Sequence, residues 1–251
     1  MQAGSLRDWK LVPIQCRYLI PPQVPLQGHN ANRWAVPLCN NAKTMYPKQN
    51  HNPDWKVLLI GGSSGVGKTV VARELANYLS LSLLLLDDVR LALQQATSNE
   101  TNPELHVFLK YETKHWRESE AVFGDWIKVG RAMLKPLNAI INHHIFIPDV
   151  GAMIIEGDGI LPIISSHFLE PQDVCTVFIV EKDEKQLLHN LRSRGRGFND
   201  WDKIEQDGFA HASWLYGQWL AQEAKRLELP VIDAQPQQTI LERLLSVAGV
   251  Q

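Results

Sequence analysis

The stretch GSSGVGKT at residues 62–69 constrains this chain more than any other feature of its sequence. It satisfies the pattern G-x-x-x-x-G-K-[ST], a glycine-rich loop that closes around a phosphate group. The apolar run KVLLI at 56–60 precedes it, and a segment with apolar residues at helical spacing follows at 68–80. A strand, a glycine turn and a helix in that order predict a phosphate-binding loop. A purely structural glycine turn is the alternative.

Each residue type in the loop has a chemical reason to be there. Glycines allow positive φ, so successive backbone N–H groups can point inward at a phosphate, and the start of the following helix adds its positive dipole end. The ammonium of Lys68 can reach the β- and γ-phosphates, and the hydroxyl of Thr69 can bind Mg²⁺. The expected cofactors are therefore ATP and Mg²⁺. The expected nucleotide-binding residues are Gly62, Ser63, Ser64, Gly65, Val66, Gly67, Lys68 and Thr69.

Short apolar runs alternate with helical segments from residue 55 onward. Strands are predicted at 56–60, 81–86, 151–157, 174–180 and 230–234. Helices are predicted at 68–80, 89–96, 123–144, 183–192, 207–228 and 237–248, whereas the polar stretch 97–120 has no clear period. This alternation predicts an α/β fold with a parallel sheet that helices cover on both faces.

Residues 1–53 differ from the rest in composition. They are rich in Pro, Asn and Gln, and they carry six Lys/Arg against one acid, whereas the remaining residues carry 19 basic and 26 acidic side chains. We expect an irregular N-terminal extension over 1–53 and one domain over 54–251. Aromatic residues within the extension favour partial packing on the domain; a tail without function is the alternative.

The overall composition excludes several classes of protein. Among the 251 residues there is no apolar stretch of about 18 residues, and the N-terminus lacks an apolar signal region. The three cysteines are widely spaced, which argues against a disulfide framework or a zinc cluster. The net charge is −2, so bulk electrostatics do not indicate a nucleic-acid partner. We expect a cytoplasmic protein with neither a membrane nor a nucleic acid as its partner.

Acidic residues follow the second predicted strand. Asp87 should emerge at the carboxyl edge of the sheet, where open α/β sheets bind ligands. There it can bind an acceptor hydroxyl and take its proton during phosphoryl transfer. Capping of a helix that begins at Val89, by Asp87 or Asp88, is the structural alternative, and both roles can hold together. Arg90, one turn into that helix, is positioned to bind an anionic group of the acceptor.

A further acid ends the third predicted strand. Glu156 directly follows the apolar run AMII, a position from which a carboxylate commonly holds Mg²⁺ through water. We therefore predict that Glu156, with Thr69, serves the metal and that it also borders the acceptor. Asp158 lies in a Gly-Asp-Gly turn and is the alternative magnesium partner.

Three arginines alternate with small residues in RSRGRG at 192–197. Glycines between arginines favour a flap whose guanidinium groups close over phosphates and expel water. We assign catalytic roles to Arg192 and Arg196 and nucleotide binding to Arg194. A solvated basic loop or an RNA-binding patch are the alternatives.

Taken together, these residues resemble the P-loop small-molecule kinases, and among them the 2-phosphoglycerate kinase family. The resemblance covers about residues 55–248 and rests on GGSSGVGKT (61–69), DDVR (87–90), IIEGDGILP (154–162) and the arginine-containing segment that leads to LPVIDA (229–234). It implies a three-layer P-loop kinase fold with a five-stranded sheet in the order 2-3-1-4-5. It also implies ATP along the loop, with adenine near the turn after 232–234, and an acceptor between Asp87, Arg90 and the lid.

We therefore expect an ATP- and Mg²⁺-dependent kinase of a small, hydroxylated, anionic metabolite. Two alternatives from other classes stay open. A nucleic-acid end kinase or RNA-associated ATPase would use the basic residues of 1–53 and of 192–196. A non-catalytic regulatory module would bind nucleotide without transferring phosphate.

Overall fold

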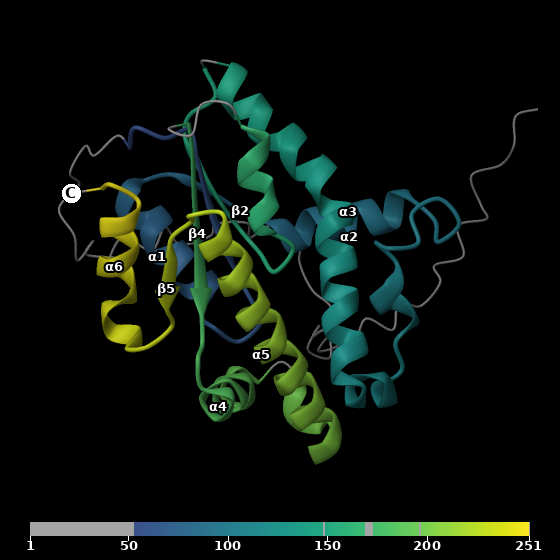
Figure 1. Ribbon diagram of the computed structural model, residues 1–251. Coiled ribbons are helices and arrows are strands. Elements are labelled where there is room, and N and C mark those ends of the chain that lie inside the picture. Colours follow the sequence, from purple (N-terminus) through teal and green to yellow (C-terminus); the bar gives the residue numbers. More distant parts are fainter. Residues whose placement is uncertain (1–52, 148, 169–172, 196, 251) are drawn as a thin grey trace, which may run out of the picture.

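A five-stranded parallel sheet forms the centre of the computed structural model, which describes residues 53–147, 149–168, 173–195 and 197–250 (Figure 1). The strand order is β2-β3-β1-β4-β5, which confirms the predicted order. The strands are β1 (Val57–Gly62), β2 (Ser82–Leu85), β3 (Met153–Glu156), β4 (Val174–Val180) and β5 (Val231–Asp233). Every residue of β1 is buried, as expected for the central strand of a covered parallel sheet.

Helices cover both faces of the sheet. On one face α1 (Lys68–Leu79) packs against β1, β2 and β3 and beside α6 (Ile240–Val247). On the other face α3 (Ser119–Phe146) and α5 (Lys203–Arg226) pack against each other and against β1 and β4 (Figure 1). The three-layer arrangement that the sequence predicts is therefore present. Within the described residues, no helix is both long and apolar enough to cross a membrane.

The second strand ends earlier than predicted, and the helix after it begins earlier. Helix α2 runs over Leu86–Ala96, so Asp87 and Asp88 lie inside its first turn. The expected cap is wrong, because Leu85 occupies the N-cap position and no side chain caps the helix. The physical reason lies at Leu86, which is buried and packs against Gly157 in the turn after β3.

The polar stretch 97–118 forms short 3₁₀ helices instead of a periodic element. They are η1 (Val107–Lys110) and η2 (Thr113–Arg117). Aromatic rings hold this stretch in place: Trp116 stacks on Trp201 with ring centroids 5.4 Å apart and meets Phe209 of α5 edge-on at 5.2 Å. Because these contacts come from distant parts of the chain, no local sequence period marks the segment.

The predicted basic flap is shorter than its sequence suggests. Helix α4 (Glu184–Arg194) extends through the first two arginines and ends at Gly195, whose φ is 70°. Helix α5 begins at Lys203, where Asp202 and Glu205 form a capping box. Between them lies only a short connection with one 3₁₀ turn, η5 (Phe198–Asp200). Two further turns, η3 (Pro162–His167) and η6 (Gln237–Thr239), complete the described elements.

Residues 1–52 lie outside the described part of the chain, so the expected irregular extension over 1–53 and its separation from the domain at 54–251 stay predictions.

Candidate active site

The loop at 62–69 has the backbone that a phosphate cradle requires. Gly62, Gly65 and Gly67 have φ values of 144°, 89° and 92°, a region that side-chain-bearing residues rarely adopt. At Gly62 there is also no room, because a Cβ would lie 2.3 Å from the carbonyl oxygen of Ile179. Gly67 is the N-cap of α1, so the positive end of that helix faces the loop.

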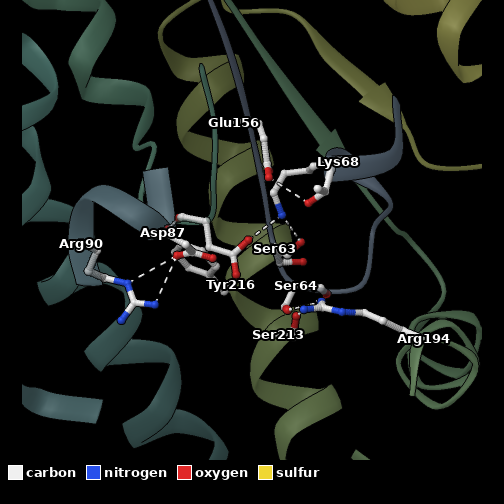
Figure 2. Close-up of polar contacts among 11 residues, drawn as sticks. Ser63, Ser64, Lys68, Asp87, Arg90, Glu156, Arg194, Ser213 and Tyr216 are labelled. Carbon is white, nitrogen blue, oxygen red and sulfur yellow. Dashed lines mark hydrogen bonds and ion pairs between the residues drawn. The ribbon is translucent and has the colours of Figure 1, made fainter. Parts of the chain in front are cut away.

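Helix α5 supports the loop from behind, a contact that the sequence did not indicate. Ser213 Oγ donates to the carbonyl oxygen of Ser64 at 2.8 Å. One turn further, Gly217 allows close approach, since a Cβ there would lie 3.0 Å from Ser63 Oγ. Arg194, at the end of α4, donates from Nη1 to Ser64 Oγ at 3.2 Å (Figure 2). The predicted nucleotide-binding arginine is therefore placed at the phosphate loop.

Thr69 and Glu156 meet as the sequence predicts. The parallel register places Ile60 beside Glu156, and Thr69 Oγ1 donates to Glu156 Oε1 at 2.8 Å. Burial raises the pKa of the Glu156 carboxyl; Lys68 and Thr69 oppose this shift, and two nearby carboxylates add to it. A cation at this position would offset the cost of burying that charge.

The oxygens of Thr69 and Glu156 fit Mg²⁺, which prefers hard oxygen ligands. The described residues contain no group of three His, Cys, Asp or Glu side chains that could hold a metal ion. Magnesium in nucleotide sites keeps several waters and takes one or two carboxylates together with substrate phosphates. A hydroxyl and a single carboxylate are therefore a sufficient protein contribution.

Lys68 contacts Asp158, a residue 90 positions away that the sequence does not link to it. Its ammonium donates to the carbonyl oxygen of Ser63 at 2.8 Å and to Asp158 Oδ1 at 2.5 Å. Tyr216 of α5 donates its phenolic O–H to the backbone carbonyl of Asp158 at 2.6 Å. Figure 2 shows Lys68 of the loop and Tyr216 of α5 on either side of this contact. The sequence predicts Asp158 as a turn residue or as the alternative magnesium partner to Glu156, and it does not indicate this contact with Lys68.

Asp87 is more exposed to solvent than Lys68, Glu156 and Asp158. Its side chain is 58% exposed and pairs with Arg90, whose Nη2 lies 3.3 Å from Asp87 Oδ1. The negative charge of Asp87 contributes to the raised pKa of the buried Glu156 carboxyl, so the two acids lie close enough to interact. The predicted acceptor residues thus lie at the same edge of the sheet as Lys68, with Asp87 open to solvent.

The structure separates Arg192 from Arg194. Arg192 faces α5, where its Nε donates to Gln206 Oε1 at 2.8 Å and its Nη2 lies 3.7 Å from Asp207. It makes no contact with the phosphate loop among the described residues, so its predicted catalytic role gains no support here. Arg194 contacts the loop, and Arg196 lies outside the described residues.

Comparison with known proteins supports the resemblance that the motifs predicted. No family model matches the chain. The chain is 25% identical over 182 residues to the 2-phosphoglycerate kinase of Methanocaldococcus jannaschii, an alignment that covers 70% of this chain and 58% of the relative. The chain thus spans little more than half the length of this curated relative. This similarity confirms the expected resemblance to a P-loop small-molecule kinase.

Solved structures that align with the chain include two further kinases. A gluconokinase from Sinorhizobium meliloti 1021 aligns over 79% of this chain and 93% of its own, with a TM-score of 0.45 and 12% identity. A shikimate kinase from Acinetobacter baumannii aligns over 76% of this chain and 94% of its own, with a TM-score of 0.42 and 19% identity. At these scores the likeness is too distant to bear on the substrate.

Proposed function

We propose that the protein is an ATP- and Mg²⁺-dependent phosphotransferase that acts on a hydroxyl group of a small anionic metabolite of the 2-phosphoglycerate type. One observation carries this proposal. A phosphate loop with its lysine, a threonine–carboxylate pair suited to Mg²⁺, and an exposed carboxylate beside an arginine lie together at the carboxyl edge of the sheet. This edge is where open α/β sheets bind ligands.

The phosphate loop and Lys68 provide binding and charge stabilisation for the nucleotide. The backbone N–H groups of the loop bind the β-phosphate. The buried ammonium of Lys68 stabilises the negative charge that spreads over the transferred phosphoryl group. Thr69 and Glu156 would hold Mg²⁺, which supplies charge neutralisation between the phosphates when bound. Arg194, anchored at Ser64, adds a positive group at the outer side of the same phosphates.

The acceptor side relies on Asp87 and Arg90. When the acceptor binds, Arg90 exchanges its long contact with Asp87 for an anionic group of the acceptor, to which a guanidinium binds through paired hydrogen bonds. The carboxylate of Asp87 orients the acceptor hydroxyl and takes its proton as the hydroxyl oxygen bonds to the γ-phosphorus. The bond from that phosphorus to the β–γ bridging oxygen breaks in the same step, and ADP leaves. An acceptor that combines a hydroxyl with a phosphate or carboxylate satisfies both residues.

Phosphoryl transfer to a panel of acceptors tests this proposal. The full chain is incubated with Mg²⁺ and γ-labelled ATP, with 2-phosphoglycerate, gluconate, shikimate or glycerol as the acceptor. We expect ADP release that depends on an acceptor, label in the acceptor, and a preference for anionic acceptors. The Lys68→Ala variant serves as the matched background. Acceptor-independent ATP hydrolysis, or no turnover with any member of the panel, would count against a metabolite kinase.

The nucleic-acid alternative rests on the basic residues of 1–53 and of 192–196. Arg192 and Arg194 are both exposed, but Arg192 pairs with Gln206 and Asp207 and Arg194 with Ser64, so the two guanidinium groups have separate partners in the protein. Oligonucleotide binding with a steep dependence on salt concentration would favour this alternative.

A further inference from the structure

The lysine of the phosphate loop is bound to two oxygens of its own protein. Lys68 is 6% exposed, and its ammonium contacts the backbone carbonyl of Ser63 and the carboxylate of Asp158. The contact with Asp158 is the shorter of the two, at 2.5 Å, and joins opposite charges with little solvent between them. Among the described residues, Lys68 is the partner found for the Asp158 carboxylate.

An ammonium group has three N–H donors. Two of those of Lys68 are used by Ser63 and Asp158, so one is left for a nucleotide. A phosphate-loop lysine contacts both the β- and the γ-phosphate, which needs two donors. One protein contact must therefore break when a triphosphate binds. The contact to Asp158 is the one that breaks, because a carboxylate and a phosphate beside the same ammonium repel each other.

Asp158 itself is held in place, so the lysine must be the partner that moves. Tyr216 is completely buried and donates to the backbone carbonyl of Asp158 at 2.6 Å. Its ring stacks on Trp126, with centroids 5.7 Å apart. Gly157, just before Asp158, packs against Leu86, where an added Cβ would lie 2.7 Å from the leucine Cβ. The turn that carries the carboxylate is therefore fixed by α5 and α2.

We propose that Asp158 competes with the triphosphate for Lys68: the carboxylate holds the ammonium before a nucleotide binds, and binding transfers the ammonium to the phosphates. Asp158 is thus a positioning residue that lowers the affinity for ATP while keeping Lys68 aimed at the phosphate site. This inference rests on the proposed function only in requiring that the loop binds ATP.

Nucleotide affinity tests the competition without any turnover. The dissociation constant of a non-hydrolysable ATP analogue with Mg²⁺ is measured by titration calorimetry for the full chain and for Asp158→Asn. The substitution keeps the backbone carbonyl to which Tyr216 donates, so the turn stays held. We expect Asp158→Asn to bind the analogue about tenfold more tightly, because Lys68 no longer has to leave a charged partner. A merely structural role would give weaker binding.

Two matched variants separate competition for Lys68 from simple loss of negative charge. Asp87→Asn removes a carboxylate from the same site whose partner is Arg90, and it should change the affinity by less than about twofold. In a Lys68→Ala background, Asp158→Asn should tighten binding clearly less, because only the repulsion between the carboxylate and the phosphates is then removed, so the two substitutions should be coupled.

Three results would overturn the inference. They are an unchanged or weakened affinity in Asp158→Asn, equal tightening in Asp87→Asn, and tightening that is undiminished in the Lys68→Ala background. A full chain that binds no nucleotide at all would instead contradict the proposed function, so the two failures can be told apart.

Discussion

The nucleotide side and the acceptor side of the site are built in different ways. The nucleotide side consists of β1, the loop at 62–69 and α1, which are consecutive in sequence. The acceptor side centres on Asp87 and Arg90 of α2, a helix that is held in place through Leu86 against Gly157 in the turn after β3. One side is a local unit; the other depends on long-range packing.

The difference concerns chemistry and specificity. Phosphate binding needs backbone N–H groups and a lysine at fixed spacing, so a short motif carries it. Acceptor recognition needs a surface shaped for the acceptor, and here the helix that carries Asp87 and Arg90 is positioned by packing between distant segments, as at Leu86 and Gly157. The two sides should therefore respond differently to substitution: changes on the nucleotide side should alter ATP binding, and changes on the acceptor side should alter turnover alone.

Asp87→Asn should have the largest effect on turnover. Without a carboxylate to take the acceptor proton, we expect kcat to fall by about 10²–10⁴-fold. Initial-rate measurements of ADP release with the best acceptor of the panel check this value. Asp88→Asn is the matched control, because Asp88 is an exposed neighbour in the same helical turn. Equal losses in both variants would show that the charge of the turn, and not Asp87 itself, matters.

Lys68→Ala should reduce turnover by about 10²–10³-fold, because the transferred phosphoryl group loses its buried ammonium. Unlike Asp87→Asn, it should also weaken nucleotide binding. The variant should remain folded, because the loss is confined to one side chain that contributes two hydrogen bonds and the burial of its stem, and a thermal unfolding scan checks this. A folded variant with near-normal activity would contradict the assignment of the loop.

Replacing Arg194 or Arg192 by alanine should have smaller effects on kcat, and the two effects should differ. Arg194→Ala removes the group that contacts Ser64, and we expect a 10–10²-fold decrease in kcat, as a rough magnitude for one charge-stabilising donor. Arg192→Ala removes a side chain that faces Gln206 and Asp207, and it should change kcat less than about twofold. The reverse order of effects would mean that Arg192 enters the site when substrates bind.

Tyr111→Phe should have the smallest effect. The phenol of Tyr111 donates to Asp125 at 2.7 Å, and burial together with this carboxylate raises the tyrosine pKa. Removing the hydroxyl should lower the free energy of unfolding by about 1 kcal/mol, because Asp125 keeps its contact with Lys128. Chemical denaturation measures this value. A change in ATP affinity would contradict the separation of the two sides.

Much of the fold could be predicted because its signals are local. The buried strands are short apolar runs, the helix α1 follows the glycine loop directly, and the register of β1 and β3 places Glu156 beside Ile60, near the loop, where Thr69 donates to it. Helix ends were less accurate. The sequence predicts a cap by Asp87 or Asp88 for a helix that begins at Val89, but the helix begins at Leu86, which is buried against Gly157.

The contacts that could not be predicted join segments far apart in the chain. Asp158 reaches Lys68 across 90 residues, and Tyr216 reaches Asp158 across 58. Arg192 looks like its neighbour Arg194 in sequence, yet the extension of α4 by two residues turns one toward α5 and the other toward the loop. Helix geometry of this kind depends on packing, which a pattern of residue types does not contain.

The affinity of Asp87→Asn for MgATP tests the separation of the two sides most directly. Titration calorimetry compares this variant with the full chain and with Lys68→Ala, without any acceptor present. Since the carboxylate of Asp87 faces the acceptor and pairs with Arg90, the dissociation constant should stay within about twofold of the unchanged value, while Lys68→Ala binds clearly more weakly. Loss of ATP binding in Asp87→Asn would contradict this account, because Asp87 would then belong to the nucleotide or magnesium site.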